Sequence, residues 1–470
     1  MSLRAAPPPA VEPLDLATLD RMVVGEVWTS DEAYRNLVYL CDECGSRFGG
    51  TAGERKAVQF LTSRMSQYGL DDVHTEEFEY AGWARGRARL TALSPKRRAF
   101  PCLALPYCGS GEVQGELVFL GSGHPDVYAE RADEIKGKIV MVTTESPTDL
   151  CRTMHRMEKY GRAVEAGAVG FIWMRDEPGL LEETGSLRFN APAEVIGVGV
   201  STETGAALNR LAEKGPVKLR IATANSNERM TSSNICGEVV GRESQRRLLI
   251  AGGHLDGHDI APGAIDNGSG AVIVLETARV LAKIGAHLPH TIRFVIFPVE
   301  EIGLIGSEEY VHAHRRETRN MQFMVNVDAA GGGGEPSLLI QGWRELMPVF
   351  KDIARRQNQP WKIRNGMNLY SDQFNFAAAG VPSAFMTSSR PGPRPAGRGW
   401  THTAADTLDK VSPRGLQMDA LNLARLLLYL SFQVNDWPAA HKSKAETKKL
   451  LESEGLWEVL GYEKRLPLRG

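Results

Sequence analysis

Short apolar runs alternate with amphipathic stretches along much of the chain. Residues 247–254, 291–297 and 323–327 have the length and composition of buried strands. Residues 267–285 and 415–434 repeat apolar positions at helical spacing, which predicts two long amphipathic helices. The alternation over 235–440 therefore predicts an α/β fold, in which a mostly parallel mixed sheet carries helices on both faces.

The two ends of the chain have a helical pattern. Residues 14–70 predict helices, one of which starts at a Thr51–Glu54 capping box and closes at Gly69. Residues 75–108 alternate as strands do. The tail, 441–470, predicts a charged helical segment.

The segment 113–231 has a rhythm of its own. Short strands are expected at 115–121, 137–144 and 166–174, with helical stretches near 154–166 and 203–214. The polar run 225–234 predicts a loop that separates this segment from the strands after it. We therefore predict an inserted domain over 113–231, which contains no cluster of metal-ligand residue types. The main domain comprises 14–112 and 232–440, and the tail stands apart.

Composition narrows the function classes. A chain of 470 residues is too long to fold around one ordinary hydrophobic core, so more than one domain is expected. The net charge of −2 does not favour electrostatic binding to nucleic acid or to an anionic membrane. No apolar run approaches the roughly 20 residues of a membrane span, and the first residues lack the apolar core of a signal peptide. Cys41 and Cys44 form a lone CxxC, which fits either a redox or zinc pair or two ordinary helix cysteines; the helical pattern favours the latter.

Imidazoles and carboxylates come directly after the predicted strands. His254 ends the first run, Glu300 and Glu301 follow the second, and Asp328 follows the third. Ligands bind at the carboxyl ends of the strands in open α/β sheets, so these side chains are expected to converge in one crevice. The residue types suit zinc, and their number suits two ions.

Each of these residues alone also has an ordinary explanation. A buried His254 could be structural, Asp266 or its neighbour could cap a helix, and His402 could be a polar loop residue. Glu300 and Glu301 could be solvated residues at a helix start. If both carboxylates lie at one site instead, a positive charge is needed to offset their repulsion. Taken together, they predict a site instead.

Asp256 lies two residues after His254, so on an extended segment its carboxylate can accept the second ring N–H of that histidine.

Several motifs resemble those of a known superfamily. GGHLDGH, GAIDNGSG, FPVEEIGLIGSEEY, NVDAAG, SDQF with GVPS, and THTAADTLDKV resemble the dizinc exopeptidases of the aminopeptidase and glutamate carboxypeptidase type. The segment YRNLVYLCDECGSRFGGTAGERKAVQFLTSRM is similar to the carboxypeptidase Q branch. GKIVMV, AGAVGFI and VIGVGVSTETGAAL resemble a protease-associated domain. The resemblance covers roughly residues 30–440.

The resemblance implies a zinc exopeptidase fold with two Zn²⁺ per chain, or other divalent ions. Asp266 would bridge the two metals, His254 and Asp328 would complete one site, and Glu301 and His402 would complete the other. Glu300 would be the general base, with Asp256 as the partner of His254. Tyr370, next to Ser371–Asp372, stands at an offset from an oxyanion-stabilising tyrosine of some relatives, and Asp372 is a second candidate for substrate binding.

The implied activity is hydrolysis of dipeptides or small peptides. The loop 388–400 precedes His402, and Arg390, Arg394 or Arg398 in it could hold a substrate carboxylate; the alternative is a solvated basic loop. A glutaminyl-cyclase-like acyltransferase and a catalytically inactive binding homologue are the other functions considered. The resemblance also favours a secreted or periplasmic location, and a homodimer is considered as its assembly.

Overall fold

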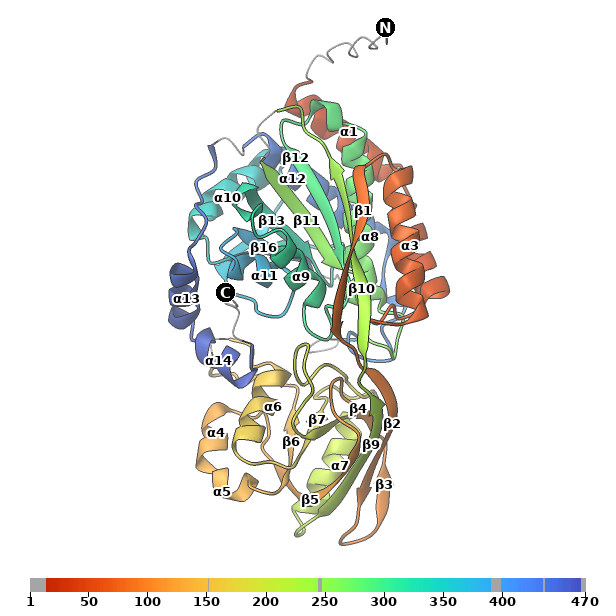
Figure 1. Cartoon of the computed structure of the whole chain (residues 1–470), viewed down its shortest axis with the longest axis vertical. Helices are drawn as coiled ribbons and strands as arrows, with labels where there is room; N and C mark the ends of the chain where they lie inside the picture. The colour runs from red at the N-terminus through yellow and green to blue at the C-terminus, as the bar shows by residue number, and fades with distance from the viewer. Residues whose placement is uncertain (1–13, 151, 244–246, 390–398, 434–435, 466–470) are drawn as a thin grey trace.

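The protein, seen in a computed structural model, folds into two lobes that are each built on an eight-stranded sheet (Figure 1). The structure describes residues 14–150, 152–243, 247–389, 399–433 and 436–465. The larger sheet has the order β1-β10-β12-β11-β13-β16-β14-β15. Its strands are β1 (Asp71–Ala81), β10 (Arg229–Val239), β11 (Leu248–His254), β12 (Thr291–Phe297), β13 (Met321–Val327), β14 (Pro336–Gln341), β15 (Lys362–Gly366) and β16 (Ser383–Ser388).

The centre of this sheet is parallel. Strand β11 pairs in parallel with β12 and β13, and β13 pairs in parallel with β16. Antiparallel pairing is found for β1 with β10, β10 with β12, and β14 with β16. All seven residues of β11 are buried, as expected for a strand that is covered on both faces. The predicted mixed, mostly parallel sheet is thus confirmed.

Helices cover both faces of the larger sheet. Leu249 and Ala251 pack into the core under α8, whereas Ile250 between them packs with Phe376 on the opposite face. The first face carries α1 (Leu16–Trp28), α2 (Glu32–Tyr39), α3 (Ala52–Gln67), α8 (Gly270–Ala282), α10 (Met347–Arg356) and α12 (Pro413–Ser431). The second face carries α9 (Ile305–Ala313) and α11 (Gln373–Ala378). Short 3-10 or π segments are η1 (Leu40–Cys44), η2 (Ala264–Ser269), η3 (Gly285–His287), η4 (Thr318–Asn320), η5 (Arg344–Leu346) and η6 (Leu408–Lys410).

The second sheet has the order β3-β2-β9-β5-β6-β7-β8-β4. Its strands are β2 (Ala84–Ala92), β3 (Arg98–Phe100), β4 (Leu103–Ala104), β5 (Gly111–Phe119), β6 (Ile139–Thr143), β7 (Gly170–Met174), β8 (Ile196–Val200) and β9 (Lys218–Ser226). The helices of this lobe are α4 (Pro125–Glu130), α5 (Ala132–Ile135), α6 (Arg156–Glu165) and α7 (Thr202–Ala212). Because β2, β3 and β4 belong to it, the second sheet starts well before residue 113 in the chain.

Two local expectations differ from the structure. The polar run 225–234, expected as a loop, is mostly strand, because β10 starts at Arg229 and residues 229–234 pair along β1. Cross-strand pairing decides the conformation there, although the run lacks an apolar pattern. Thr51 caps α3 as expected by accepting from the Glu54 amide, but the Glu54 carboxylate accepts from the Gly50 amide and so does not complete the reciprocal box.

The second lobe is attached to the first on two sides. On one side, β1 runs on into β2 and β9 turns into β10, so two neighbouring segments cross between the lobes (Figure 1). On the other side, the tail forms α13 (Lys444–Ser453) and α14 (Leu456–Tyr462), and α14 packs against α6. Arg188 of the second lobe donates to the carbonyl of Tyr462 at 2.8 Å. Among the described residues, no helix has the length and apolar character needed to cross a membrane.

Candidate metal centre

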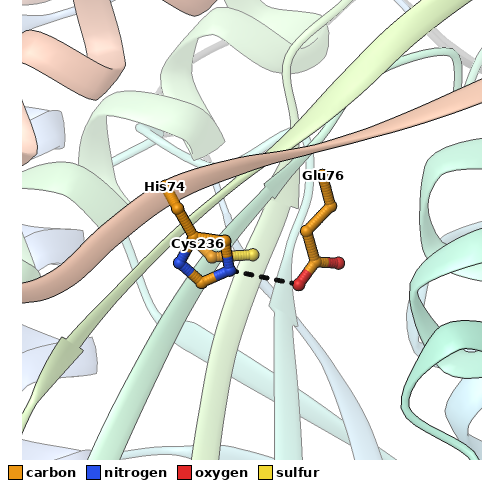
Figure 2. Close-up of side chains that lie close together, drawn as sticks. All are labelled: His74, Glu76 and Cys236. Atoms are coloured by element: carbon orange, nitrogen blue, oxygen red, sulfur yellow. Dashed lines mark hydrogen bonds and ion pairs between the residues drawn. The ribbon is translucent and has the colours of Figure 1, made fainter.

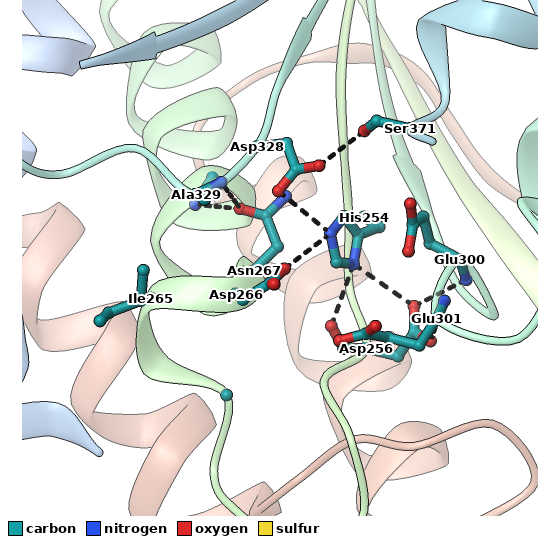
Figure 3. A network of polar contacts seen from close by, with 12 residues as sticks. His254, Asp256, Ile265, Asp266, Asn267, Glu300, Glu301, Asp328, Ala329 and Ser371 are labelled. Carbon is teal, nitrogen blue, oxygen red and sulfur yellow. Dashed lines mark hydrogen bonds and ion pairs between the residues drawn. The ribbon is translucent and has the colours of Figure 1, made fainter. Parts of the chain in front are cut away.

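Four of the polar side chains predicted from the sequence, His254, Glu300, Glu301 and Asp328, meet at the carboxyl ends of three neighbouring strands (Figure 3). Strand β11 ends on His254, and Asp328 follows the last residue of β13. Strand β12 ends at Phe297, after which a short turn brings in Glu300 and Glu301. Because β12, β11 and β13 are parallel and adjacent, their ends lie at the same edge of the sheet.

Two groups of potential ligand atoms share one carboxylate. The Nε2 atom of His254 lies 3.2 Å from Oδ1 of Asp266 and 3.5 Å from Oδ1 of Asp328. The Nε2 atom of His402 lies 3.3 Å from Oδ2 of Asp266 and 3.5 Å from Oε2 of Glu301. Asp266, on η2, therefore presents one oxygen to each histidine, which is the arrangement that a bridging carboxylate needs.

The histidine tautomers are set by backbone carbonyls. His254 Nδ1 lies 3.1 Å from the carbonyl oxygen of Asp256, whereas the Asp256 carboxylate is 3.7 Å away. This differs from the expected contact with the carboxylate, which instead accepts the amides of Glu300 and Glu301 at 3.0 and 3.1 Å. An Nδ1–H that donates to a carbonyl leaves the lone pair of Nε2 for a cation.

The second lobe orients His402. The Nδ1 atom of His402 lies 3.2 Å from the carbonyl oxygen of Thr184, and the Thr184 amide donates to the His402 carbonyl at 2.9 Å. The Thr184 hydroxyl in turn accepts from Arg85 at 3.0 Å. The backbone of one lobe thus fixes the ring orientation of a potential ligand on the other.

Burial and charge make the site receptive to cations. Burial raises the pKa of Glu300 well above its usual range, and the nearby carboxylate of Glu301 adds to that shift. Burial alone would lower the pKa of His254, but Glu300 and Asp328 raise it well above the usual value. The His254 Nε2 atom is buried without a hydrogen-bond partner among the described residues, although it faces two carboxylates. Dications between these nitrogen and oxygen atoms would remove the repulsion, so the donor set fits zinc.

The backbone around the site adopts conformations that L-residues rarely populate. Val299, just before Glu300, has φ 61°, and His402 has φ 61°. Ala329, just after Asp328, has φ 49°. A positive φ is unusual for alanine and an outlier for a β-branched valine, and such strain clusters at functional sites where surrounding contacts enforce it.

The carboxylates open into a cavity of about 1380 Å³. Its walls come from both lobes: Asp266, Glu300, Glu301, Asp328 and His402 face Arg152, His155, Arg156 and Phe189 of the second lobe. A cavity between lobes that combines apolar walls with convergent polar groups is the usual form of a small-molecule site.

Comparison with known proteins identifies the fold and its chemistry. Residues 234–427 match the model of peptidase family M28, and residues 113–208 match that of the PA domain. Mouse carboxypeptidase Q is 27% identical over 379 residues, which cover 76% of this chain and 77% of that protein. Aminopeptidase YwaD of Bacillus subtilis is 27% identical over 432 residues, which cover 88% of each. The structure of BSAP, a zinc aminopeptidase from Bacillus subtilis, superposes with a TM-score of 0.64 at 25% identity and covers 86% of this chain and 94% of that one.

The chain is a peptidase family M28 metallopeptidase with a PA domain.

The predicted substrate-binding residues of this M28 metallopeptidase have different environments. Tyr370 lines the cavity, but its ring stacks on that of His155 with the ring centres 3.9 Å apart. Its hydroxyl donates to Glu463 at 2.8 Å. The hydroxyl proton that was expected to stabilise an oxyanion is therefore already used in that hydrogen bond. Asp372 is fully buried, and burial raises its pKa to about 7. The remaining three, Arg390, Arg394 and Arg398, lie outside the described residues.

Two further residues at the site of this M28 metallopeptidase were not predicted from the sequence. His258 is buried, its Nε2 lies 2.9 Å from Oε2 of Glu301, and its ring is 4.4 Å from that of His402. Burial lowers the pKa of His258 to about 3, so its ring is neutral. Asp406 accepts the amides of Ile265 and Asp266 at 2.7 and 3.0 Å. The position of His258 in GGHLDGH, four residues after His254, was a usable signal, whereas Asp406 had none besides its proximity to His402.

Proposed function

We propose that this M28 metallopeptidase is a dizinc exopeptidase that hydrolyses dipeptides or small peptides. The observation that carries the proposal is the sharing of Asp266 between two groups of ligand atoms. One carboxylate that faces two histidines from opposite oxygens suits a pair of ions better than a single one. The exopeptidase names of the relatives support the same direction, one a carboxypeptidase and one an aminopeptidase.

The proposed ligand set is based on these contacts. His254, Asp266 and Asp328 would hold one zinc ion, since their ligand atoms lie within 4.8 Å of one another. Asp266, Glu301 and His402 would hold the other, and His258 borders this second ion because its Nε2 reaches the same Glu301 oxygen. Zinc at these positions would polarise the scissile carbonyl and make an attacking water more acidic.

Glu300 is the proposed general base. Its carboxylate lines the cavity, while its neighbour Glu301 turns toward His258 and His402. The Asp256 carboxylate accepts the backbone amides of Glu300 and Glu301, which helps to keep their two side chains pointing in different directions. In this position Glu300 can take the proton of the attacking water and deliver it to the leaving amine.

The second lobe is proposed to shape the cavity and position His402 without donating a side chain to the metals. Its cavity wall contributes Arg152, His155 and Arg156, and its Thr184 carbonyl holds the His402 ring. We place the inserted domain at 113–231 in the chain, with β2, β3 and β4 as an extension of its sheet from the preceding segment.

One set of measurements tests this function. Zinc-loaded protein should contain two zinc ions per chain by elemental analysis and should cleave free dipeptides in a panel with N-blocked and C-amidated peptides. Glu300→Gln should keep both ions and lose kcat by about 10²–10⁴-fold, because only the proton transfer is removed. Asp409→Asn changes an exposed carboxylate of η6, after His402; it is the matched control and should leave kcat unchanged.

Three results would contradict the proposal. A reproducible stoichiometry near one would remove the dimetal site. Near-wild-type turnover of Glu300→Gln with both metals bound would remove the base. Two bound ions with no hydrolysis of any peptide in the panel would favour the acyltransferase or the inactive binding homologue.

A further inference from the structure

A separate group of metal-ligand side chains lies on the edge of the larger sheet, on β1 and β10 (Figure 2). His74 and Glu76 are two residues apart on β1, so their side chains share one face of the strand. Cys236 on β10 pairs directly with His74 across the strands and shares that face as well. One ligand atom from each lies within 4.8 Å of the other two. We propose that His74, Glu76 and Cys236 form a third divalent-metal site, distinct from the two in the cleft.

The backbone of β1 prepares His74 for this role. The register between β1 and β10 shifts between Asp71 and His74, and Asp72 in that bulge has φ 48°. The Asp72 carbonyl oxygen lies 2.7 Å from Nδ1 of His74. A ring that donates Nδ1–H to a carbonyl keeps the lone pair of Nε2, and bulges commonly re-aim a side chain in this way. That Nε2 atom lies 3.2 Å from Oε1 of Glu76.

Glu76 has one oxygen to spare. Its Oε1 also lies 2.8 Å from Nε2 of His314, whose Nδ1 lies 3.1 Å from Oε2 of Glu317. A ring with both nitrogens against carboxylates donates from both and is a cation, so it satisfies Oε1. The other oxygen of Glu76, Oε2, is buried and has no hydrogen-bond partner among the described residues. A buried carboxylate oxygen without a partner is costly, and a cation shared with His74 and Cys236 would satisfy it.

The donor atoms define the class of metal. Sulfur, imidazole nitrogen and one carboxylate oxygen suit zinc and other borderline transition metals, whereas calcium and magnesium prefer oxygen alone. Three protein ligands leave a fourth position for water. The His74 side chain is 41% exposed, which gives ions a path from solvent, while Cys236 is 1% exposed and closes the inner side. Binding releases the thiol proton of Cys236, so occupancy should increase with pH.

Cobalt spectroscopy on the full-length protein tests this site independently of the cleft. The cleft ligands proposed above contain no sulfur, so a thiolate-to-cobalt charge-transfer band reports a cysteine ligand alone. Metal-free protein titrated with Co²⁺ should develop this band, and the band should saturate at one thiolate-bound cobalt per chain. Cys236→Ser should abolish it, and His74→Gln should weaken the cobalt affinity by at least the 10–100-fold seen for lost outer partners.

Two controls make the result decisive. His312→Gln changes an exposed histidine of α9, and Cys102→Ser changes a partly exposed cysteine of the second lobe; both should keep the band. Because His74 is half-exposed, His74→Gln remains informative even if Cys236→Ser fails to fold. No charge-transfer band in the wild type, or a band that His74→Gln leaves at full affinity, would overturn the proposal. Neither outcome bears on peptide hydrolysis in the cleft.

Discussion

Replacement of Asp406 by asparagine tests whether the protein holds Asp266 in place before any metal arrives. Asp406 is 2% exposed, and each of its oxygens accepts one amide, from Ile265 at 2.7 Å and from Asp266 at 3.0 Å. Asparagine has nearly the same shape but replaces one oxygen with an NH₂ group, which would face a backbone N–H. One hydrogen bond is lost, and two donors then oppose each other next to the proposed bridging carboxylate.

The expected magnitude comes from those two contacts. A hydrogen bond to a charged group contributes about 1.5–3 kcal/mol, and 1.4 kcal/mol corresponds to tenfold in affinity. Loss of one such bond therefore predicts about 10–100-fold weaker zinc binding, the range usual for partners that orient a ligand. A competitive chelator titration measures the affinity of both ions, and kcat/KM at saturating zinc measures what geometric damage remains.

The matched control is Asp409→Asn in η6, three residues further along the chain. Asp409 has a side chain that is 69% exposed and pairs with Lys410, so its replacement should change zinc affinity by less than about threefold. The reasoning fails if Asp406→Asn binds both zinc ions as tightly as Asp409→Asn does. In that case η2 would hold Asp266 without help from Asp406.

Three further predictions concern the cavity wall, the core and the tail. Arg364 lines the cavity from β15, so Arg364→Ala should raise KM for a free dipeptide but not for its C-terminal amide. The control Lys362→Ala, on the same strand, should leave KM unchanged for both substrates. Equal changes in KM on both substrates would exclude a contact between Arg364 and the substrate carboxylate. Arg47 is fully buried and donates to the carbonyls of Leu255 and Gly263. Each buried carbonyl left unsatisfied costs about 1–3 kcal/mol, so Arg47→Met should reduce the free energy of unfolding by about 2–6 kcal/mol in denaturant titrations, and a loss under about 1 kcal/mol would contradict this. Burial raises the pKa of Glu463 from 4.5 to about 7, so as pH rises this carboxyl ionises in the unfolded chain before it ionises in the folded protein. The contribution of Glu463 to stability is therefore lost as pH rises from about 4.5 to 7. Between pH 5 and 8 the free energy of unfolding of the wild type should fall by about 2–3 kcal/mol more than that of Glu463→Gln, and parallel pH profiles would refute this.

The strands that carry the site could be predicted because each is a local pattern. The run that ends on His254 is apolar and buried, and β11 ends on that residue in the structure. Helix α8 starts at Gly270, within the predicted range 267–285. In both elements the local sequence and the tertiary environment favour the same conformation.

The parts that could not be predicted depend on distant partners. Residues 229–234 are polar and become strand only because they pair with β1. The carboxylate of Asp256 meets the amides of Glu300 and Glu301, 44 and 45 residues away, and so is withdrawn from His254. Thr184 meets His402 across 218 residues. No periodicity or short motif encodes such contacts.

The two-sided attachment of the second lobe has a steric consequence for which bonds can be cut. Neighbouring segments cross between the lobes on one side, and α14 is fastened to α6 and Arg188 on the other. A lobe fixed on both sides would resist swinging away to admit the middle of a long polypeptide, so we expect a substrate to enter end first. The preference for chain termini would then come from the frame around the metals, and a variant that released α14 would be expected to accept internal bonds as well as terminal ones.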